Sequence, residues 1–348
     1  MCIMRKVLPM KVPLIRSYAN YAHIFSILDT HGENYYPWVY NHYVQLCVPD
    51  DYSIFPVDYM VTRMYTNTPN FFTSRLERKM AVTIKSGILN FIRFAIDNGY
   101  YIFMMLEVSH IAAYEWMRFH EPLLYGYDDE KEEIYFADTY MNGKYSEGIA
   151  TYTEIVNATG DELNWNTFHT TNLGLDVMCM KYRDMKEEFV FNKNTYIHFL
   201  NCYINQEDTY NFFGKIPGVT RGDVTPNVCG IGIYNILQKH LQFVREDVNA
   251  FIDKRGFYVI LEHKKLLEKT MAFLLGECWK EVFPVEWQLV QEEVKNATIC
   301  LYLCLKYNVT QDVRILNRIS EYAIILEQTE KSLFPNLIKI VENSIISN

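Results

Sequence analysis

The sequence predicts an α+β protein in which a mixed N-terminal domain, residues 1–165, precedes a mainly helical domain, residues 166–348. Two observations support this class. Residues 119–140 contain two short apolar runs separated by turn residues and charges, which is typical of a β-hairpin. From about residue 170 onward, apolar residues recur at helical spacing in long segments, the first of which is LDVMCMKYRDMKEEFVF.

The hairpin is expected to have strands at residues 122–125 and 134–137, joined by a Gly-Tyr-Asp-Asp turn. His120 precedes the first strand and Asp138 follows the second. The two ends of an antiparallel hairpin lie side by side, so we expect the imidazole to contact the carboxylate. Such a contact fixes the histidine tautomer and leaves one nitrogen free to act as a base. His110 is the second candidate for the base, and His120 as a plain strand-end residue is the alternative.

Three further elements are predicted in the N-terminal domain. A helix is expected to begin near Ala22, with Asn20 as its N-cap. Apolar residues at helical spacing predict a helix over 75–98, which ends at an Asn-Gly C-cap signal. The continuous apolar run over 100–108 predicts a buried strand.

Composition excludes several classes of function. The net charge is −9 and no Lys/Arg run is present, so neither nucleic acid nor a membrane surface is an expected partner. No apolar run reaches the roughly 18 residues that a membrane span requires. The 8 cysteines show neither a CxxC motif nor metal-ligand spacing. With no secretory signal, these features predict a cytoplasmic protein with reduced cysteines and no bound metal.

The arrangement of His120, an apolar strand, a Gly-Tyr-Asp turn, a second strand and Asp138 resembles papain-like cysteine enzymes of the bacteriocin-processing type. More narrowly, it is similar to the family named for the N-terminal domain of the butirosin-biosynthesis acyltransferase, which includes the closthioamide amide synthetase. Short motifs at residues 230–234 (Gly-Ile-x-x-Tyr) and 262–265 (Glu-His-Lys-Lys) extend the resemblance into the C-terminal half. The motif at 262–265 by itself predicts only a surface pair between residues 262 and 265 and a packed or partly exposed His263.

The resemblance implies a papain-like fold and an acyltransferase or amide synthetase activity. The enzyme would take an acyl or peptidyl group from the phosphopantetheine thioester of a carrier protein and transfer it to a small amine or diamine. This is thiotemplated, nonribosomal-peptide-type biosynthesis, and no other cofactor is implied. A cysteine peptidase of the same fold and a non-catalytic binding scaffold are the alternatives.

The resemblance also implies a nucleophilic cysteine at the start of the first helix, where the helix dipole stabilises a thiolate. The position so aligned is Ala22. Three explanations are open: a Cys→Ala change made to capture an acyl complex, a natural pseudoenzyme, or a wrong register. The first is favoured because the rest of the pattern is intact. Cys47 and Cys2 are weak substitutes for the missing thiol.

The remaining site residues are expected around the first helix and the strand over 100–108. The oxyanion of a tetrahedral intermediate would be stabilised by the backbone N–H of Ala22, together with the Asn20 or Ser17 side chain. Tyr21 and Glu107 are the candidate substrate contacts, with Glu107 holding the amine. A helix cap is the alternative role for Asn20, and a solvated strand end is the alternative for Glu107.

Overall fold

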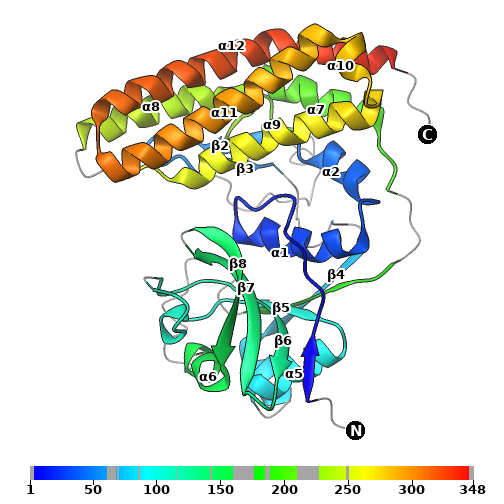
Figure 1. The fold of residues 1–348 in the computed structure, drawn as a ribbon, viewed down its shortest axis with the longest axis vertical. Helices are drawn as coiled ribbons and strands as arrows, with labels where there is room; N and C mark the ends of the chain where they lie inside the picture. The colour runs from blue at the N-terminus through cyan, green and yellow to red at the C-terminus, as the bar shows by residue number, and fades with distance from the viewer. Residues whose placement is uncertain are drawn as a thin grey trace, which may run out of the picture. The chain divides into compact units, whose positions relative to one another are not determined.

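The chain folds into two compact units: unit 1 comprises Met1–Asn34 and Arg63–Glu188, and unit 2 comprises Tyr35–Thr62 and Phe189–Asn348 (Figure 1). This division differs from the expected boundary at 165, because the strand Asp176–Tyr182 pairs within the N-terminal sheet and the segment 35–62 belongs with the C-terminal helices. The computed structural model describes residues 4–60, 68, 70–84, 87–115, 117–141, 143–159, 176–184, 189–209, 227–247 and 251–344.

Unit 1 is built on a seven-stranded sheet in which all pairings are antiparallel. Its order is β4-β9-β5-β6-β7-β8, and β1 pairs with β6. The strands are β1 (Arg5–Val7), β4 (Phe71–Glu77), β5 (Tyr101–Met104), β6 (Leu123–Asp128), β7 (Glu133–Met141), β8 (Lys144–Thr151) and β9 (Asp176–Tyr182).

Helices accompany this sheet. Helix α1 contacts β7, α5 contacts β5 and β6, and α6 contacts β7 and β8. The helices of unit 1 are α1 (Ala19–Leu28), α4 (Arg78–Ile84), α5 (Ile88–Asp97) and α6 (Tyr152–Thr159), with short 3₁₀ turns η1 (Asp29–His31) and η2 (Val108–His110).

The predicted hairpin is confirmed, with longer strands than expected. Strand β6 pairs antiparallel with β7, so that Leu123 lies opposite Ala137. The expected turn residues 126–128 belong to β6, because β1 pairs with them on the other side. The turn lies at 129–132 instead. Asp138 falls inside β7 rather than beyond it, since β8 extends the pairing of β7 to Met141.

Two expected helices contain strands. Residues 71–77 form β4 and residues 176–182 form β9, and these two strands pair along their whole length. Among the described residues, the rest of the expected helix over 75–98 contains two helices, α4 and α5, and α5 is preceded by Gly87 with φ of 134°. The strand expected over 100–108 is also shorter, because β5 ends at Met104 and η2 begins at Val108.

Unit 2 is mainly helical. The long helices α9, α11 and α12 pack consecutively, since α11 contacts both α9 and α12, and α7 and α8 contact α12 (Figure 1). A small sheet of order β10-β2-β3 packs against α8 and α9. The elements are α2 (Tyr36–His42), β2 (Leu46–Pro49), β3 (Asp58–Tyr59), α7 (Lys193–Asn205), β10 (Asn227–Cys229), η5 (Gly230–Gly232), α8 (Ile233–Glu246), α9 (Lys254–Leu275), α10 (Trp279–Val282), α11 (Pro284–Thr310) and α12 (Val313–Asn343).

The coarse fold class is therefore confirmed: an antiparallel sheet with helices is followed by a helical C-terminal region.

Candidate functional site

His120 and Asp138 are in direct contact in unit 1. The Nδ1 atom of His120 lies 2.6 Å from Oδ2 of Asp138. Two backbone features hold the pair. His120 exchanges two backbone hydrogen bonds with Leu106, and β7 holds Asp138 between β6 and β8. The contact predicted from the hairpin is confirmed.

Asp138 is fully buried, and three donors surround its carboxylate. Oδ2 accepts from His120 Nδ1 and from the hydroxyl of Tyr114, each at 2.6 Å, and Oδ1 accepts from the backbone N–H of Thr139 at 2.6 Å. Burial, and next the charge of Asp138, raise the pKa of Tyr114 far above its usual range, so this hydroxyl stays a donor. The carboxylate thus receives the hydrogen bonds that a buried charge requires.

The His120 ring is oriented by this contact. A carboxylate can only accept, so Nδ1 carries the proton and the lone pair of the neutral ring lies on Nε2. The His120 side chain is 24% exposed, whereas the Asp138 side chain is 0% exposed. The ring is therefore partly accessible to solvent, while the carboxylate that orients it is held in the interior.

A second histidine, His23, lies next to the pair but is not suited to proton transfer. Its Nε2 donates to the carbonyl of Glu121 at 2.8 Å, and its Nδ1 accepts from the Tyr145 hydroxyl at 3.0 Å. Burial lowers the pKa of His23 to about 4, so the ring is neutral at pH 7. Both nitrogens are thus occupied, and His23 joins α1 to the segment before β6 and, through Tyr145, to β8.

Ala22 does not stand at a helix start. Helix α1 begins at Ala19, and the N–H of Ala22 donates to the carbonyl of Tyr18 at 3.0 Å. The Ala22 side chain is fully buried. The proposed oxyanion role of this N–H is therefore wrong, since its proton is used within the helix. The residue at the helix start is Ala19, which is half-buried and again not a cysteine.

The other residues predicted around α1 have structural surroundings. Asn20 lies in the first turn, so it is not the N-cap, which is Tyr18. Tyr21 is buried and packs edge-on against Tyr18, with ring centroids 6.3 Å apart. Ser17 is also buried. Nothing in these positions identifies an oxyanion donor or a substrate contact.

Glu107 pairs with basic side chains of its own neighbourhood. Its Oε1 lies 3.1 Å from Arg118 Nε, and its Oε2 lies 3.9 Å from His110 Nε2. This carboxylate therefore already has a cationic partner, Arg118, where an amine substrate was expected. His110 lies in η2 and is exposed. The carboxylate near it, Glu107, is shared with Arg118. His120 is thus the better oriented of the two candidate bases.

No activated thiol accompanies the pair in the described part of unit 1. Cys179, in β9, is the single cysteine there, and burial raises its pKa to about 11. A thiol with a raised pKa is a poor nucleophile at neutral pH. Cys47 lies in β2 of unit 2, and Cys2 lies outside the described residues.

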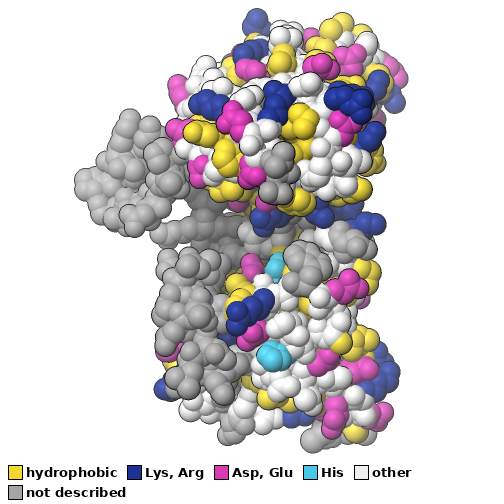
Figure 2. Space-filling view, turned by 90° about the vertical axis from the view of Figure 1, so that its left-hand side faces the viewer, with side chains coloured by type: hydrophobic (Ala, Val, Ile, Leu, Met, Phe, Trp, Pro, Cys, Tyr) yellow, Lys and Arg dark blue, Asp and Glu magenta, His cyan; other side chains and the backbone are white. Residues whose placement is uncertain are grey.

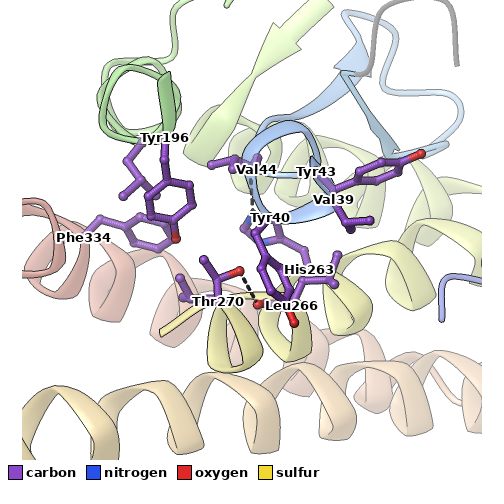
Figure 3. Close-up of a pocket in the computed structure, with 11 residues that line it drawn as sticks. Val39, Tyr40, Tyr43, Val44, Tyr196, His263, Leu266, Thr270 and Phe334 are labelled. Atoms are coloured by element: carbon purple, nitrogen blue, oxygen red, sulfur yellow. Dashed lines mark hydrogen bonds between the residues drawn. The ribbon is translucent and has the colours of Figure 1, made fainter. Parts of the chain in front are cut away.

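A small cavity in unit 2 is too confined to be a substrate site. Tyr40, Tyr196, His263, Thr270 and Phe334 are among the side chains that surround it (Figure 3). Its volume is about 10 Å³, roughly the space that one water molecule needs. We assign it no ligand.

Beside this cavity, the two short motifs of the C-terminal half meet in a buried polar cluster. Lys264, which the sequence did not single out, is fully buried, and its Nζ contacts Glu330 Oε1. The Tyr203 and Tyr234 hydroxyls donate to the same carboxylate at 3.0 and 2.8 Å. His263 is packed as expected, and its Nε2 donates to the Val44 carbonyl at 2.8 Å. The cluster fixes α7, α8, α9 and α12 to one another.

No family model matches the sequence, and no curated protein matches it at a significant level. On the face drawn in Figure 2, basic and acidic side chains of the described surface are interspersed. Among the described residues, no helix is long and apolar enough to cross a membrane, and no three His, Cys, Asp or Glu side chains gather as a metal site. The candidate site in unit 1 is therefore defined by the contact between His120 and Asp138.

Three site residues were not anticipated as such: Tyr114, His23 and Tyr145. Tyr114 contacts Asp138, His23 contacts the Glu121 carbonyl, and Tyr145 contacts His23. Each of these contacts joins segments distant in sequence. The one available signal was the position of His23 beside residue 22.

Proposed function

We propose that unit 1 is a papain-like acyl-transfer domain in which His120, oriented by Asp138, acts as a general base. The substrate would be an acyl thioester on the phosphopantetheine arm of a carrier protein, and the acceptor a small amine. The observation that carries the proposal is the 2.6 Å contact between His120 Nδ1 and a fully buried Asp138 carboxylate, which leaves Nε2 as the basic atom.

Alanine occupies positions 19 and 22, so no cysteine acyl-enzyme can form there. The proposed step is therefore a direct attack of the amine on the thioester. The amine nitrogen bonds to the thioester carbonyl carbon, and His120 Nε2 takes a proton from that nitrogen. The C–S bond then breaks, and the imidazolium returns the proton to the leaving thiolate. A cysteine peptidase reaction is disfavoured, because it requires the thiol that these positions lack.

The test is amide formation from an acyl pantetheine thioester and a diamine, followed by mass spectrometry of the amide and by release of free thiol. We expect His120→Gln to lower the rate by about 10²–10⁴-fold, the usual contribution of a general base. Asp138→Asn should lower it comparably, because it favours the wrong tautomer. His110→Gln is the matched control and should leave the rate unchanged.

Amide formation at an equal rate in wild type and His120→Gln would refute the proposal. The second candidate, a non-catalytic binding scaffold, is favoured by the absence of a thiol at positions 19 and 22. It predicts that the thioester binds, as measured by calorimetry, and is not consumed.

A further inference from the structure

Two cysteines of unit 2 lie directly opposite each other in a β-ladder. Strand β10 pairs antiparallel with β2, and Cys229 is the register partner of Cys47. Directly opposed residues of an antiparallel pair point to the same face, with Cα atoms about 4.5–5.5 Å apart. Disulfides span Cα separations of about 4.4–6.8 Å. The backbone therefore already meets the distance requirement for a disulfide.

The other cysteine pair of unit 2 offers a contrast. Cys300 and Cys304 are four residues apart on α11, and both are buried. Side chains at this helical spacing have Cβ atoms about 5–6 Å apart, beyond the roughly 3.5–4.5 Å that a disulfide needs. Of these two pairs, only the cross-strand pair has suitable geometry.

The position of β10 does not depend on a covalent link. Gly230 follows Cys229 directly and has φ of 57°, which favours glycine. A Cβ at Gly230 would overlap the carbonyl of Tyr203 at the end of α7, so the chain passes close to that helix. Packing thus holds the end of β10 beside β2, and a disulfide would form between thiols already in place.

The two thiols differ in access to solvent. Cys47 is half-buried, whereas Cys229 is 2% exposed, and neither takes part in a disulfide. A small disulfide reagent therefore reaches Cys47 first. In a thiol–disulfide exchange, Cys47 would therefore react with the reagent and Cys229 would react in the second step.

We propose that Cys47 and Cys229 form a dithiol site that low-molecular-weight disulfides oxidise to an intramolecular disulfide. The Cys47 thiolate attacks one sulfur of the reagent, breaks its S–S bond and releases one thiol, which leaves a mixed disulfide. The Cys229 sulfur then attacks the Cys47 sulfur and displaces the second reagent thiol. Two protein thiols are oxidised, and one reagent disulfide is reduced to two thiols.

The disulfide would join two distant parts of unit 2. Cys47 belongs to the segment Tyr35–Thr62 and Cys229 to the segment Phe189–Asn348, and the chain between them includes Arg63–Glu188 of unit 1. A cross-link that closes so long a loop restricts the unfolded chain strongly. We therefore expect oxidation to raise the thermal midpoint of the full chain reversibly.

The test treats the full-length protein with oxidised glutathione, blocks the remaining thiols and maps tryptic peptides without reduction. Residues 17–63 and 222–239 form tryptic peptides with one cysteine each, Cys47 and Cys229. We expect a cross-linked 17–63/222–239 species that a reducing agent separates. Cys229→Ser should instead retain glutathione on Cys47, because the resolving thiol is missing.

The matched control is Cys300→Ser, which should give the same cross-link as wild type. Wild-type protein that shows only a glutathione adduct at Cys47, or no modification at either cysteine, would overturn the proposal. Since the readout is a mass and not a rate, it is independent of any acyl-transfer activity.

Discussion

Asp138 is the residue on which the geometry of the unit 1 site depends. A fully buried carboxylate is stable as an anion only when donors surround it, and His120, Tyr114 and Thr139 supply those donors. His120 and Tyr114 share one oxygen, Oδ2. The Tyr114 hydroxyl therefore competes with the imidazole for the same negative charge, and it limits how strongly Asp138 favours the imidazolium.

This competition gives a prediction at the residue scale. In Tyr114→Phe, Asp138 loses a donor and its charge acts more strongly on His120. The pKa of His120 should then rise above its wild-type value. The measurement is an NMR titration of the His120 ring nitrogens.

The control for this experiment is Tyr140→Phe. Its ring centroid is 4.9 Å from that of Tyr114, but its hydroxyl donates to the Glu147 carbonyl and not to Asp138. An unchanged His120 titration in Tyr114→Phe, or an equal shift in both variants, would show that the Tyr114 hydroxyl does not tune the pair.

At the scale of the element, the start of α1 decides where a nucleophile could stand. The N–H groups without an intrahelical acceptor precede Ala22, so the favourable end of the helix dipole lies at Ala19. This boundary is three residues before the expected one. One explanation for the missing cysteine was that the nucleophile position had been aligned wrongly to residue 22. The observed helix start moves that position to residue 19, which is also alanine.

Introducing a thiol at each position tests this boundary. Ala19→Cys should react with iodoacetamide at least about tenfold faster than Ala22→Cys, because the helix start lowers the thiol pKa and the side chain at 22 is buried. Alkylation rates measured by mass spectrometry provide the comparison, and circular dichroism checks that both variants fold. Faster reaction at position 22 would place the functional helix start there.

Strands β4 and β9 show why local periodicity failed for two elements. Helical spacing over 75–98 and from residue 175 onward predicted helices, yet residues 75–77 belong to β4, which pairs with β9, and β9 also pairs with β5. Pairing on both edges satisfies the backbone of β9 by partners distant in sequence. Such partners cannot be read from a local window. The hairpin β6–β7 was predictable because its partners are close in sequence.

At the scale of the molecule, unit 2 contains a buried carboxyl that should make stability depend on pH. Glu293 is fully buried, and neither of its oxygens has a hydrogen-bond donor among the described residues. Lys264 Nζ lies 3.6 Å from Oε2, too far for a hydrogen bond. Burial raises the pKa of Glu293 from 4.5 to about 7.

The sign of the effect follows from linkage. The native state retains a proton on Glu293 that the unfolded chain releases, so the free energy of unfolding falls as the pH rises from 4.5 to about 7. Glu293→Gln removes this dependence. Relative to wild type, we expect the variant to gain on the order of 3 kcal/mol over that interval.

Urea denaturation at pH values below 4.5 and above 7 measures the difference. Glu321→Gln is the matched control, because this glutamate on α12 is exposed and should give the wild-type pH dependence. A pH dependence in Glu293→Gln equal to that of wild type would show that Glu293 does not hold a proton in the folded state.

The sequence by itself determined the α+β class, the hairpin and the pairing of His120 with Asp138, because each rests on residues that are neighbours along the chain or on a simple turn. Tertiary structure decided the helix start at Ala19, the strand identity of β4 and β9, the assignment of residues 35–62 to unit 2, the third donor Tyr114 and the buried Lys264 cluster. Those features depend on burial and on hydrogen bonds between segments that are distant in sequence. The free energy of these contacts exceeds the intrinsic helix or strand preference of a short segment, so the segment alone does not predict them.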